Sequence, residues 1–496
     1  MKQFTLDEVN SAIGVDPIYK TEGQVFPTAV DIEGVSSDTR EIQPGQIFFA
    51  IKGDNLDGND YVAEALDKGA VAVVMDDRTK IPDKGIIILV EDSVEALCKL
   101  AKYYRSKLNA KVVGVTGSVG KTSAKDFIAE VAATSFKTWK TWKNKNNPIG
   151  LSHTILSAPQ DTEVLVLEMG MRGLGEISVL TNIACPDVAV ITCVGNSHIE
   201  CLGSRENIRK AKMEIVEGLQ NGGVLIVNGD DPFLFDYAKQ EFSINHPLAA
   251  VSLDKTEDPD KMRNCTLFFR GTDIRFDDTG ADFSIDATLA DKKYHRDDFR
   301  LNVTGPHNVL NALIACLCQT VLEIGTASVF SEEEARQALD KIRAALAAHE
   351  RESGRGAVYN TRDYTVIDDA YNAAPESMES AFENLKLLKN CKRKIAALGN
   401  MLELGSFAPV LHEQTGKSCA TFNFDHVFIT GENADDFIRG ARSVDPDIKI
   451  TKCTDTEDVK KNLEDYLEPG DAVLFKASHA FGFEELAAYF RTKGDA

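Results

Sequence analysis

Short apolar runs rich in valine and isoleucine recur along the chain, and amphipathic segments separate them. In the middle of the chain these runs occupy residues 111–116, 164–168, 188–192 and 224–228. A continuous apolar run of this length is typical of a strand that is buried on both faces, and the intervening segments predict helices. The pattern therefore predicts an α/β protein built on parallel sheets, which helices cover on both sides.

The N-terminal stretch, residues 1–90, predicts a small α/β unit without a nucleotide-binding motif. A polar turn at residues 36–40 precedes a buried strand, and a helix at 62–68 is followed by strands at 70–75 and 86–90. An amphipathic helix, 93–108, then leads into the next unit. We expect this first unit to be a separate domain, because 496 residues are too many for one hydrophobic core.

Two further units follow, which we place at residues 91–324 and 325–496. Residues 247–303 alternate between apolar and polar positions around Gly and Asp turns, which predicts an antiparallel patch attached to the central unit, and a helix is expected at 307–322. In the last unit, strand–helix alternation resumes with predicted strands at 365–369, 394–399, 426–431 and 472–476. This favours a second doubly wound domain, without a phosphate loop of its own.

A glycine-rich turn between a strand and a helix is the most specific feature of the central unit. The segment reads T-G-S-V-G-K-T-S over residues 116–123, directly after the predicted strand. Backbone N–H groups of such a loop, together with the helix N-terminus, bind phosphate oxygens. We expect Lys121 to reach the β- and γ-phosphates and the Thr122 hydroxyl to bind Mg²⁺. The full motif has a Gly at the position of Val115, so this is a shorter form of the loop.

Composition narrows the range of partners. The formal net charge is −22, which disfavours nucleic acid or an anionic membrane as the main partner but leaves room for a small anionic ligand. The N-terminus lacks the apolar core of a signal peptide, and no run of about 18 apolar residues predicts a membrane span. The ten Cys are scattered without a C-x-x-C pair, and Cys316 and Cys318 fall in an apolar helix pattern. We expect reduced thiols and a cytoplasmic protein.

Three polar residues of the central unit stand out by position or spacing. Glu168 ends a predicted strand, where a carboxylate can hold the Mg²⁺ of a nucleotide at Thr122, although it could also cap a helix. His198 follows another strand end, and its residue type fits a structural, a metal-binding or a catalytic role. Lys212 lies fourteen residues further on, and its surroundings by themselves indicate a solvated helix lysine.

Other polar groups gather at helix starts and turns. Asn308 and Asn311 share one face of a predicted helix, where an Asn pair can bind the edge of a base or cap the helix. Asp368 and Asp369 end a strand of the third unit before a Pro-bounded turn, which favours a ligand-binding site over turn chemistry. In the first unit, Ser37, Thr39 and Arg40 could bind a phosphate or a sugar, but the residues alone favour a turn that Asp38 caps.

Taken together, these motifs resemble the Mur ligases of peptidoglycan synthesis along nearly the whole chain. The ATP loop of that family matches residues 116–122, and its adenine-contacting segment matches G-P-H-N-V-L-N-A at 305–312. The motif N-N-P-I-G at 146–150 also fits the family. Residues 168–177, 368–378 and 399–405 resemble the branch that adds D-alanyl-D-alanine, whereas the D-N-P-R motif of the diaminopimelate-adding branch is absent.

The resemblance implies a fold, an activity and a set of site residues. The fold would comprise an N-terminal UDP-sugar domain (1–90), a central ATPase domain with a parallel sheet (91–324) and a C-terminal Rossmann-like domain (325–496). The activity would be an ATP- and Mg²⁺-dependent amide ligation of D-Ala-D-Ala to UDP-MurNAc-tripeptide through an acyl phosphate, by a monomer. The implied nucleotide-binding residues are Thr116, Gly117, Ser118, Val119, Gly120, Lys121, Thr122, Ser123, Asn308, Asn311 and Asp369.

The resemblance also assigns metal, catalytic and substrate residues. Thr122, Glu168, His198 and Lys212 would bind metal, with Lys212 carbamylated so that its amine becomes an anionic ligand. Catalysis would depend on Lys121, His198, Lys212 and an arginine at the γ-phosphate, for which Arg355 fits the expected spacing and Arg351 is the competing choice. Ser37, Thr39, Arg40 and Asn372 would contact the substrates.

Departures from the family pattern fall in the third unit. Ala374 stands where Asn is usual, and Ala477 and His479 stand where Gly and Arg are more typical, so the pocket for the incoming dipeptide differs from the usual one. Two other functions fit the ATP loop. One is a ligase that adds a single amino acid, either another Mur ligase or a folylpolyglutamate-type ligase. The other is a nucleotide switch, which does not need the acidic and His residues outside the loop.

Overall fold

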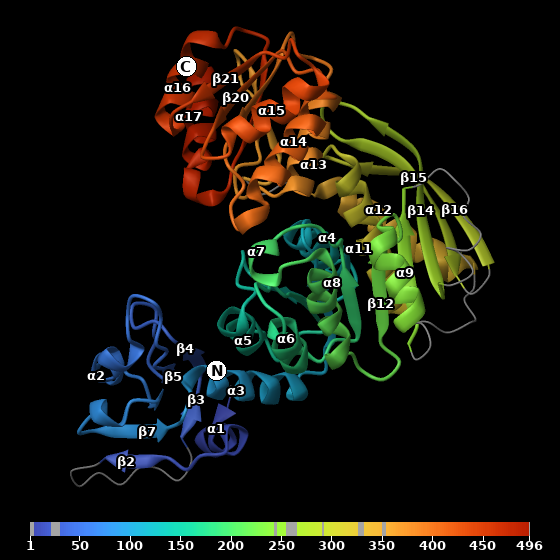
Figure 1. The fold of residues 1–496 in the computed structure, drawn as a ribbon. Helices are drawn as coiled ribbons and strands as arrows, with labels where there is room; N and C mark the ends of the chain where they lie inside the picture. Colours follow the sequence, from blue (N-terminus) through green and yellow to red (C-terminus); the bar gives the residue numbers. More distant parts are fainter. Residues whose placement is uncertain are drawn as a thin grey trace.

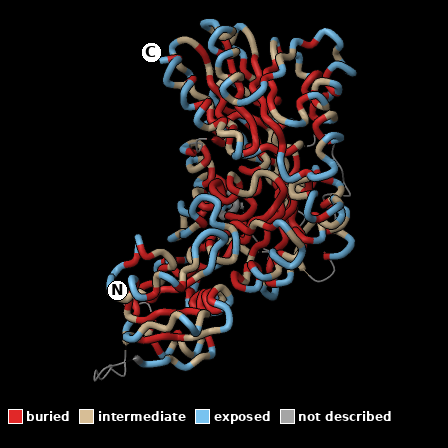
Figure 2. Tube along the Cα trace, turned by 60° about the vertical axis from the view of Figure 1, so that its left-hand side comes forward, coloured by how far each residue is buried: buried red, intermediate tan, exposed pale blue. Residues whose placement is uncertain are grey.

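A computed structural model describes residues 4–20, 30–242, 246–253, 265–289, 292–325, 332–349 and 354–495. Its three lobes follow one another along the chain, from the N-terminal lobe through the central lobe to the C-terminal lobe (Figure 1). Buried segments run through the middle of each lobe, and exposed segments form the outer turns (Figure 2). The mixed α/β class with parallel sheets that the apolar runs predicted is confirmed.

The N-terminal lobe is built on a five-stranded sheet in the order β2-β7-β6-β5-β4. Its strands are β4 (Gly34–Ser36), β5 (Gln46–Phe49), β6 (Ala72–Met75), β7 (Gly85–Leu89) and the antiparallel edge strand β2 (Ile18–Lys20). Strands β1 (Phe4–Thr5) and β3 (Asp31–Ile32) form a separate pair, and the helices are α1 (Leu6–Ile13) and α2 (Val62–Asp67). The predicted helix at 62–68 and the strands at 70–75 and 86–90 are confirmed within a few residues.

Helix α3 (Ser93–Lys107) connects this lobe to the central one. Asp92 caps its first turn by accepting hydrogen bonds from the backbone N–H groups of Val94 and Glu95. Leu97, Leu100 and Tyr104 lie on its buried face, and the helix packs against α1 of the N-terminal lobe and against α5 and α6 of the central lobe. The apolar stripe of α3 therefore joins the cores of the two lobes.

A nine-stranded sheet in the order β16-β15-β14-β13-β12-β11-β8-β10-β9 forms the central lobe. The strands are β8 (Lys111–Thr116), β9 (Thr138–Lys140), β10 (Val164–Glu168), β11 (Val188–Ile191), β12 (Val224–Asn228), β13 (Leu248–Ser252), β14 (Leu267–Phe276), β15 (Ala281–Leu289) and β16 (Lys292–Leu301). The helices are α4 (Lys121–Ala132), α5 (Pro148–Leu156), α6 (Glu176–Ala184), α7 (Ile199–Leu202), α8 (Arg205–Met213), α9 (Pro232–Glu241), α11 (Pro306–Ile324) and α12 (Glu332–Ala348).

Both faces of the parallel part of this sheet are buried, as its continuous apolar strands require. In β10, Leu165 and Leu167 belong to the core that also contains residues of α5 and α6. Val164 and Val166 of the same strand face the other core, which contains residues of α4 and α11. The alternation along one strand therefore separates two cores, and it holds the carboxyl ends of β8, β10 and β11 at one edge.

Residues 247–303 differ in part from the predicted antiparallel patch. Strand β13 is parallel to β12 and to β14, so residues 248–252 continue the parallel sheet, and only β14, β15 and β16 pair antiparallel. Strand β14 also runs unbroken through residues 271–273, where the Gly and Asp of the sequence predicted a turn. A register shift between Thr272 and Arg275, with Asp273 at φ 52°, accommodates the polar residues within one strand.

Helix α11 packs beside α4 on the same face of the sheet. Among the described residues it is the one helix long and apolar enough to cross a membrane, and 67% of its most apolar window is buried inside the fold. Both the length and the composition of α11 therefore suit a core helix of the central lobe.

The C-terminal lobe has a six-stranded sheet in the order β17-β18-β22-β19-β20-β21, parallel except for β17. The strands are β17 (Ala357–Asn360), β18 (Thr365–Asp368), β19 (Lys394–Leu398), β20 (His426–Thr430), β21 (Ile450–Cys453) and β22 (Ala472–Lys476). The helices are α13 (Pro375–Leu387), α14 (Ala408–Ala420), α15 (Ala434–Val444), α16 (Thr456–Tyr466) and α17 (Phe483–Asp495). The doubly wound layout is confirmed, and the sequence pattern missed β17 and β21.

Candidate active site

The glycine-rich loop lies between β8 and α4, where Gly120 has φ 83° and Lys121 begins the helix. A positive φ at this position suits glycine, because side chains are strained there. Gly117 is needed for a different reason, since a Cβ at this residue would lie 1.9 Å from Thr192 Oγ1. The loop thus approaches β11 too closely for any side chain at 117, and its backbone stays open for phosphate.

The segment that follows β11 supports the loop from behind. Thr192 Oγ1 donates a hydrogen bond of 2.5 Å to Val119 O, and Ser118 N donates one of 3.0 Å to Cys193 O. Gly195 N in turn donates to Ser118 Oγ at 2.9 Å. These bonds fix the conformation of the loop without a ligand, so the phosphate cradle is preformed.

Lys121 folds back over this loop, and its Nζ donates to Gly117 O at 2.8 Å. Burial lowers the pKa of Lys121, the carboxylate of Glu168 opposes that shift, and the guanidinium of Arg355 adds to it. Both charges therefore lie near enough to act on the Lys121 amine. A lysine, an arginine and a carboxylate around a phosphate loop are suited to binding the phosphates of a nucleotide with its cation.

Glu168 is buried at the end of β10, and its two carboxylate oxygens differ. Oε1 accepts a hydrogen bond of 2.8 Å from Asn146 Nδ2, whereas Oε2 is buried with no hydrogen-bond partner among the described residues. Thr116 Oγ1, at the end of the neighbouring strand β8, is likewise buried without a partner in the described part of the chain. Buried oxygen atoms without donors fit a hard cation such as Mg²⁺.

No group of three or more His, Cys, Asp or Glu residues in the described ranges is arranged to hold a metal ion by itself. A magnesium ion bound with a nucleotide does not require such a group, because it uses one or two carboxylates together with phosphate oxygens and water. Glu168 and the Thr122 hydroxyl, which is buried in the first turn of α4, fit that mode of binding.

Lys212 lies in the last turn of α8 and is 1% exposed. Burial lowers its pKa well below the ordinary value, and the nearby charge of Lys121 lowers it further. No hydrogen bond or ion pair of the Lys212 side chain is formed with any described residue. A buried lysine whose pKa is lowered differs from the solvated lysine that the local sequence indicated.

His198 lies just before α7 in the left-handed conformation, at φ 63°. Its Nδ1 is 2.7 Å from Oε2 of Glu403, which belongs to the C-terminal lobe, and this contact lowers the pKa of Glu403. A carboxylate at Nδ1 fixes the orientation of the ring and directs Nε2 away from Glu403. The arrangement suits a histidine that presents Nε2 to a ligand.

The asparagine pair and the polar end of β18 lie on either side of the loop. Asn311 is buried beside Gly120, whose Cβ position is 3.4 Å from Asn311 Nδ2, while Asn308 Nδ2 donates to Thr304 O at 2.6 Å. In the C-terminal lobe, Asp369 Oδ2 forms an ion pair of 2.7 Å with the buried Lys476. Asp369 is therefore already neutralised.

Two further predicted residues lie close to Asp369, and one lies outside the described residues. The Arg355 guanidinium stacks over the ring of Tyr371, with Cζ 4.1 Å from its centroid. Asn372 Oδ1 accepts from the N–H of the next residue at 2.9 Å, and its backbone oxygen accepts from Lys476 at 3.0 Å. Arg351, the competing choice for the γ-phosphate arginine, is not among the described residues.

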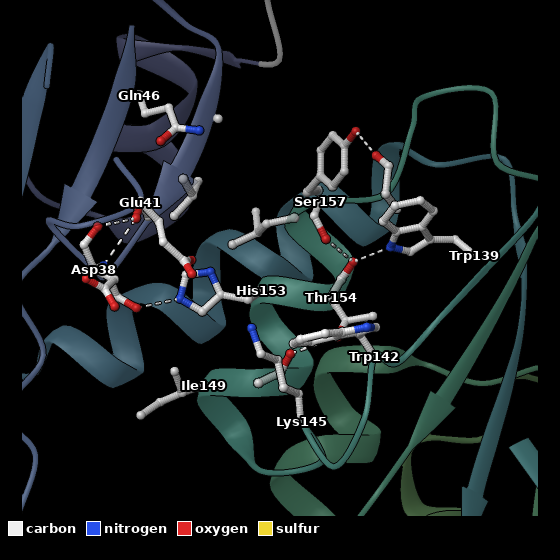
Figure 3. Close-up of a pocket in the computed structure, with 18 of the residues that line it drawn as sticks. Asp38, Glu41, Gln46, Trp139, Trp142, Lys145, Ile149, His153, Thr154 and Ser157 are labelled. Carbon is white, nitrogen blue, oxygen red and sulfur yellow. Dashed lines mark hydrogen bonds between the residues drawn. The ribbon is translucent and has the colours of Figure 1, made fainter. Parts of the chain in front are cut away.

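A second site is a cavity of about 880 Å³ between the N-terminal lobe and α5 (Figure 3). His153 points from α5 towards the loop that carries Asp38, and its Nε2 is 2.8 Å from Ser37 Oγ. Burial lowers the pKa of His153 to about 4, which keeps the ring neutral. The cavity also contains Trp142 and Lys145, which fit a large polar and anionic ligand.

The three predicted residues of the polar turn are placed differently. Ser37 lines this cavity, whereas Thr39 is buried away from it. The Arg40 side chain is 85% exposed and forms an ion pair of 2.5 Å with Asp38, in keeping with the capped turn that the residues alone favoured. Of the three, the structure thus brings only Ser37 to the cavity.

Several polar residues of the site were not picked out from the sequence. Glu376 and Glu403 reach the central lobe from the C-terminal lobe, Asn146 holds Glu168, and His153 meets Ser37. The first three stand inside motifs quoted for the resemblance, which was the available signal. His153 had none, because a single His in an apolar helix is most often a core residue.

A phosphate loop in a nine-stranded sheet, flanked by a small α/β lobe and a doubly wound lobe, is the arrangement of a three-domain ATP-dependent ligase. Sequence profiles agree along the chain: the "Mur ligase family, catalytic domain" matches residues 31–105, the "Mur ligase middle domain" 115–319 and the "Mur ligase, glutamate ligase domain" 354–479. The chain belongs to the Mur ligase family.

Individual relatives and solved structures extend this result. The chain is 35% identical to the UDP-N-acetylmuramoyl-tripeptide--D-alanyl-D-alanine ligase of Bacillus subtilis over 92% of each chain, and 30% identical to that of Synechocystis over 91% of this chain and 90% of the other. The crystal structure of MurF from Acinetobacter baumannii superposes with a TM-score of 0.82 at 25% identity over 99% of each chain. MurF from Thermotoga maritima in complex with ADP gives 0.76 at 28% identity, over 93% of this chain and 97% of the other.

Proposed function

We propose that this protein is the ligase that joins D-Ala-D-Ala to UDP-MurNAc-tripeptide at the expense of ATP. The observation that carries the proposal is the cluster of Lys121, Arg355 and Glu168 at a preformed phosphate loop, in a chain with D-alanyl-D-alanine ligases among its relatives. The domains would be those expected from the sequence. Residues 1–90 bind the UDP-sugar, 91–324 bind ATP, and 325–496 close on the nucleotide and bind the dipeptide.

The phosphates of ATP bind along residues 116–123. The loop N–H groups and the N-terminus of α4 donate hydrogen bonds to the phosphate oxygens, and Lys121 exchanges the carbonyl oxygen of Gly117 for the β- and γ-phosphates. Arg355 approaches the γ-phosphate from the C-terminal lobe. Its charge already acts on the Lys121 amine, which supports this placement over a role elsewhere on the surface.

The nucleoside end of ATP binds between α11 and the polar end of β18. Asn311, beside Gly120, and Asn308 face the adenine, and Asp369 accepts hydrogen bonds from the ribose hydroxyls. In the absence of a nucleotide, Lys476 forms an ion pair with Asp369. The incoming dipeptide binds in the same lobe, near Asn372.

Mg²⁺ fits the donors that surround the loop. Glu168 Oε2, the Thr122 hydroxyl and phosphate oxygens would hold one ion, and His198 with a carbamylated Lys212 would hold a second. The lowered pKa of the buried Lys212 amine supports carbamylation, because only an unprotonated amine adds CO₂. When bound, Mg²⁺ neutralises the charge that spreads over the transferred phosphoryl group.

Ligation proceeds in two steps. The terminal carboxylate of the tripeptide attacks the γ-phosphorus of ATP, the P–O bond to ADP breaks, and an acyl phosphate forms. The amine of D-Ala-D-Ala, after losing a proton, then attacks the acyl carbon, and inorganic phosphate leaves with the electron pair of the C–O bond. Lys121 and Arg355 stabilise charge in the first step, and the lobes bring the two substrates together.

The UDP-sugar binds in the cavity between the N-terminal lobe and α5. Its size suits a nucleotide sugar, and Ser37, Trp142 and Lys145 offer hydrogen bonds, a stacking surface and a cation. Thr39 and Arg40 are retained as further contacts of this lobe. We propose that the protein acts as a monomer in the cytoplasm, where the reduced state of its ten cysteines is maintained.

Phosphate release in the presence of all three substrates tests this proposal. Purified protein with ATP and Mg²⁺ is given UDP-MurNAc-tripeptide, with either lysine or diaminopimelate as its third residue, together with D-Ala-D-Ala or with single amino acids. We expect phosphate release and a new amide product, by mass, only with the dipeptide. Turnover with a single amino acid would assign the protein to another ligase of the family. Slow hydrolysis that no amine changes would identify a nucleotide switch.

A further inference from the structure

The short segment Gly195–His198 of the central lobe is contacted by side chains of the C-terminal lobe at two of its residues, Asn196 and His198. It links β11 to α7, and it supports the phosphate loop through two hydrogen bonds to Ser118: Gly195 N donates to Oγ at 2.9 Å, and Ser197 Oγ donates to the carbonyl oxygen at 3.3 Å. The segment ends at His198. Its position therefore affects the phosphate loop on one side and the His198 ring on the other.

Glu376 reaches this segment from the first turn of α13. Its Oε1 accepts hydrogen bonds from the backbone N–H of Asn196 at 2.8 Å and from Asn196 Nδ2 at 2.7 Å. Its Oε2 is buried without a partner among the described residues, and its charge acts on Lys212. Two charge-assisted hydrogen bonds from one residue fix both the backbone and the side chain of Asn196.

Gly195 makes room for this carboxylate. A Cβ at this residue would have the Glu376 Cδ at 2.3 Å and both carboxylate oxygens at 2.6 Å as its three nearest atoms. Gly195 is not among the residues with positive φ, so its backbone conformation is open to alanine. A glycine at position 195 is therefore required by the close approach of Glu376 from the C-terminal lobe.

Glu403 holds the other end of the segment. Its Oε2 contacts His198 Nδ1 at 2.7 Å, and its backbone oxygen accepts from Glu200 N at 3.4 Å. The short helix η4 (Gly405–Phe407), which follows Glu403, packs against α7 at the edge of the central lobe that faces the C-terminal lobe (Figure 1). Two carboxylates of the C-terminal lobe therefore contact residues only two positions apart in the central lobe.

We propose that Glu376 and Glu403 are positioning residues that clamp the Gly195–His198 segment when the C-terminal lobe is docked. Docking of this lobe would then fix both the hydrogen bonds from the segment to the phosphate loop and the orientation of His198. The proposal rests on the proposed function for its kinetic consequences only. Neither Glu376 nor Glu403 is among the residues proposed to contact ATP, and each instead contacts the Gly195–His198 segment, whose position catalysis needs. The clamp should therefore act on kcat and leave the KM for ATP nearly unchanged.

Kinetics of matched variants test the clamp. We expect Glu376→Ala to lower kcat at least about tenfold, with the KM for ATP within about twofold of the wild type, and Glu376→Gln, which keeps one acceptor oxygen, to lower it less. Glu403→Gln should lower kcat in the same way. Glu379→Ala, an exposed carboxylate on the same helix, is the control and should keep the wild-type kcat.

Gly195→Ala tests the same contact from the opposite side. It should reproduce the loss of kcat of Glu376→Ala, because its methyl group displaces the carboxylate. The double variant Gly195→Ala/Glu376→Ala should be no slower than Glu376→Ala, since the obstructed group is then absent. Losses that multiply in the double variant, or a Glu376→Ala variant with wild-type kcat, would overturn the clamp.

Hydrogen exchange gives a readout that does not depend on turnover. In Glu376→Ala we expect amide exchange of residues 195–199 to rise at least about tenfold, while strand β12 keeps its wild-type protection. Unchanged exchange at 195–199 would contradict the clamp, and so would an equal rise in β12, which indicates general loosening. If the wild type fails to ligate D-Ala-D-Ala, the proposed function fails, and the exchange experiment still decides on the clamp.

Discussion

Replacing Lys212 by methionine should make the protein more stable and nearly inactive. The Lys212 amine is buried, its pKa is lowered, and it has no hydrogen-bond or ion-pair partner in the described part of the chain. An uncompensated polar group in a protein interior costs about 1–3 kcal/mol, and methionine fills a similar volume without that cost. We therefore expect Lys212→Met to raise the free energy of unfolding by about 1–3 kcal/mol.

Such a gain corresponds to a rise of about 2–10 °C in the unfolding midpoint of a domain of this size. The same substitution removes the group that carbamylation would turn into a metal ligand, so we expect kcat to fall at least about 100-fold, because metal stabilisation of the transition state is worth several kcal/mol. The stability measurement uses calorimetry in buffer free of CO₂, and the activity measurement uses phosphate release with bicarbonate added.

Lys210→Met is the matched control, because Lys210 lies in the same turn of α8 and is exposed. It should change neither the midpoint by more than about 1 °C nor the activity, as is usual for surface substitutions. A Lys212→Met protein with an unfolding midpoint below that of the wild type would refute the argument that the buried amine destabilises the fold. A variant with wild-type turnover would refute the assignment of Lys212 to the site.

Three further predictions test other parts of the molecule. Glu168→Gln should raise the Mg²⁺ concentration needed for half-maximal phosphate release at least about tenfold, because a neutral amide binds a hard cation poorly. Gly117→Ala should abolish binding of an ATP analogue in calorimetry, since its methyl group meets Thr192 Oγ1 at 1.9 Å, and a variant that binds normally would show that the loop adapts. His153 has its pKa lowered to about 4 by burial, so the unfolded chain binds more protons between pH 6.5 and 4, and stability is lost as the pH falls through that range. That loss amounts to about 2 kcal/mol after allowance for the partial exposure of the ring, and it should be absent in His153→Gln in thermal unfolding across pH.

The fold followed from the sequence wherever one periodicity dominated. Strands β10, β12 and β22 begin and end at the predicted residues, because continuous β-branched runs buried on both faces leave no alternative. The pattern failed at the short edge strands β17 and β21, which are too brief to show a period. It also divided β14, where the polar residues of a bulge resemble those of a turn.

Only those site residues that a single stretch of sequence marks out could be predicted. The phosphate loop and Glu168 were found because each stands at a strand end, and such ends meet at one edge of a parallel sheet. Lys212 became a candidate through family resemblance alone, because its burial depends on packing that local sequence does not encode. The contacts of Glu376 and Glu403 depend on how two lobes dock, and no spacing along the chain carries that information.

The chain has a negative net charge, whereas cations gather at its phosphate loop. The structure explains how the two are compatible. The net charge of −22 is distributed over the surface, whereas the cations Lys121 and Arg355 lie at one loop. In the absence of a nucleotide, Lys121 donates to a loop carbonyl and Lys476 pairs with Asp369. When a nucleotide binds, its phosphate and ribose would replace partners that Lys121 and Asp369 already have. No charged side chain then has to be buried without a partner, which would cost free energy. Because a positive cluster at a helix N-terminus acts over short distances, a protein with a large negative net charge can still bind anionic substrates at this loop.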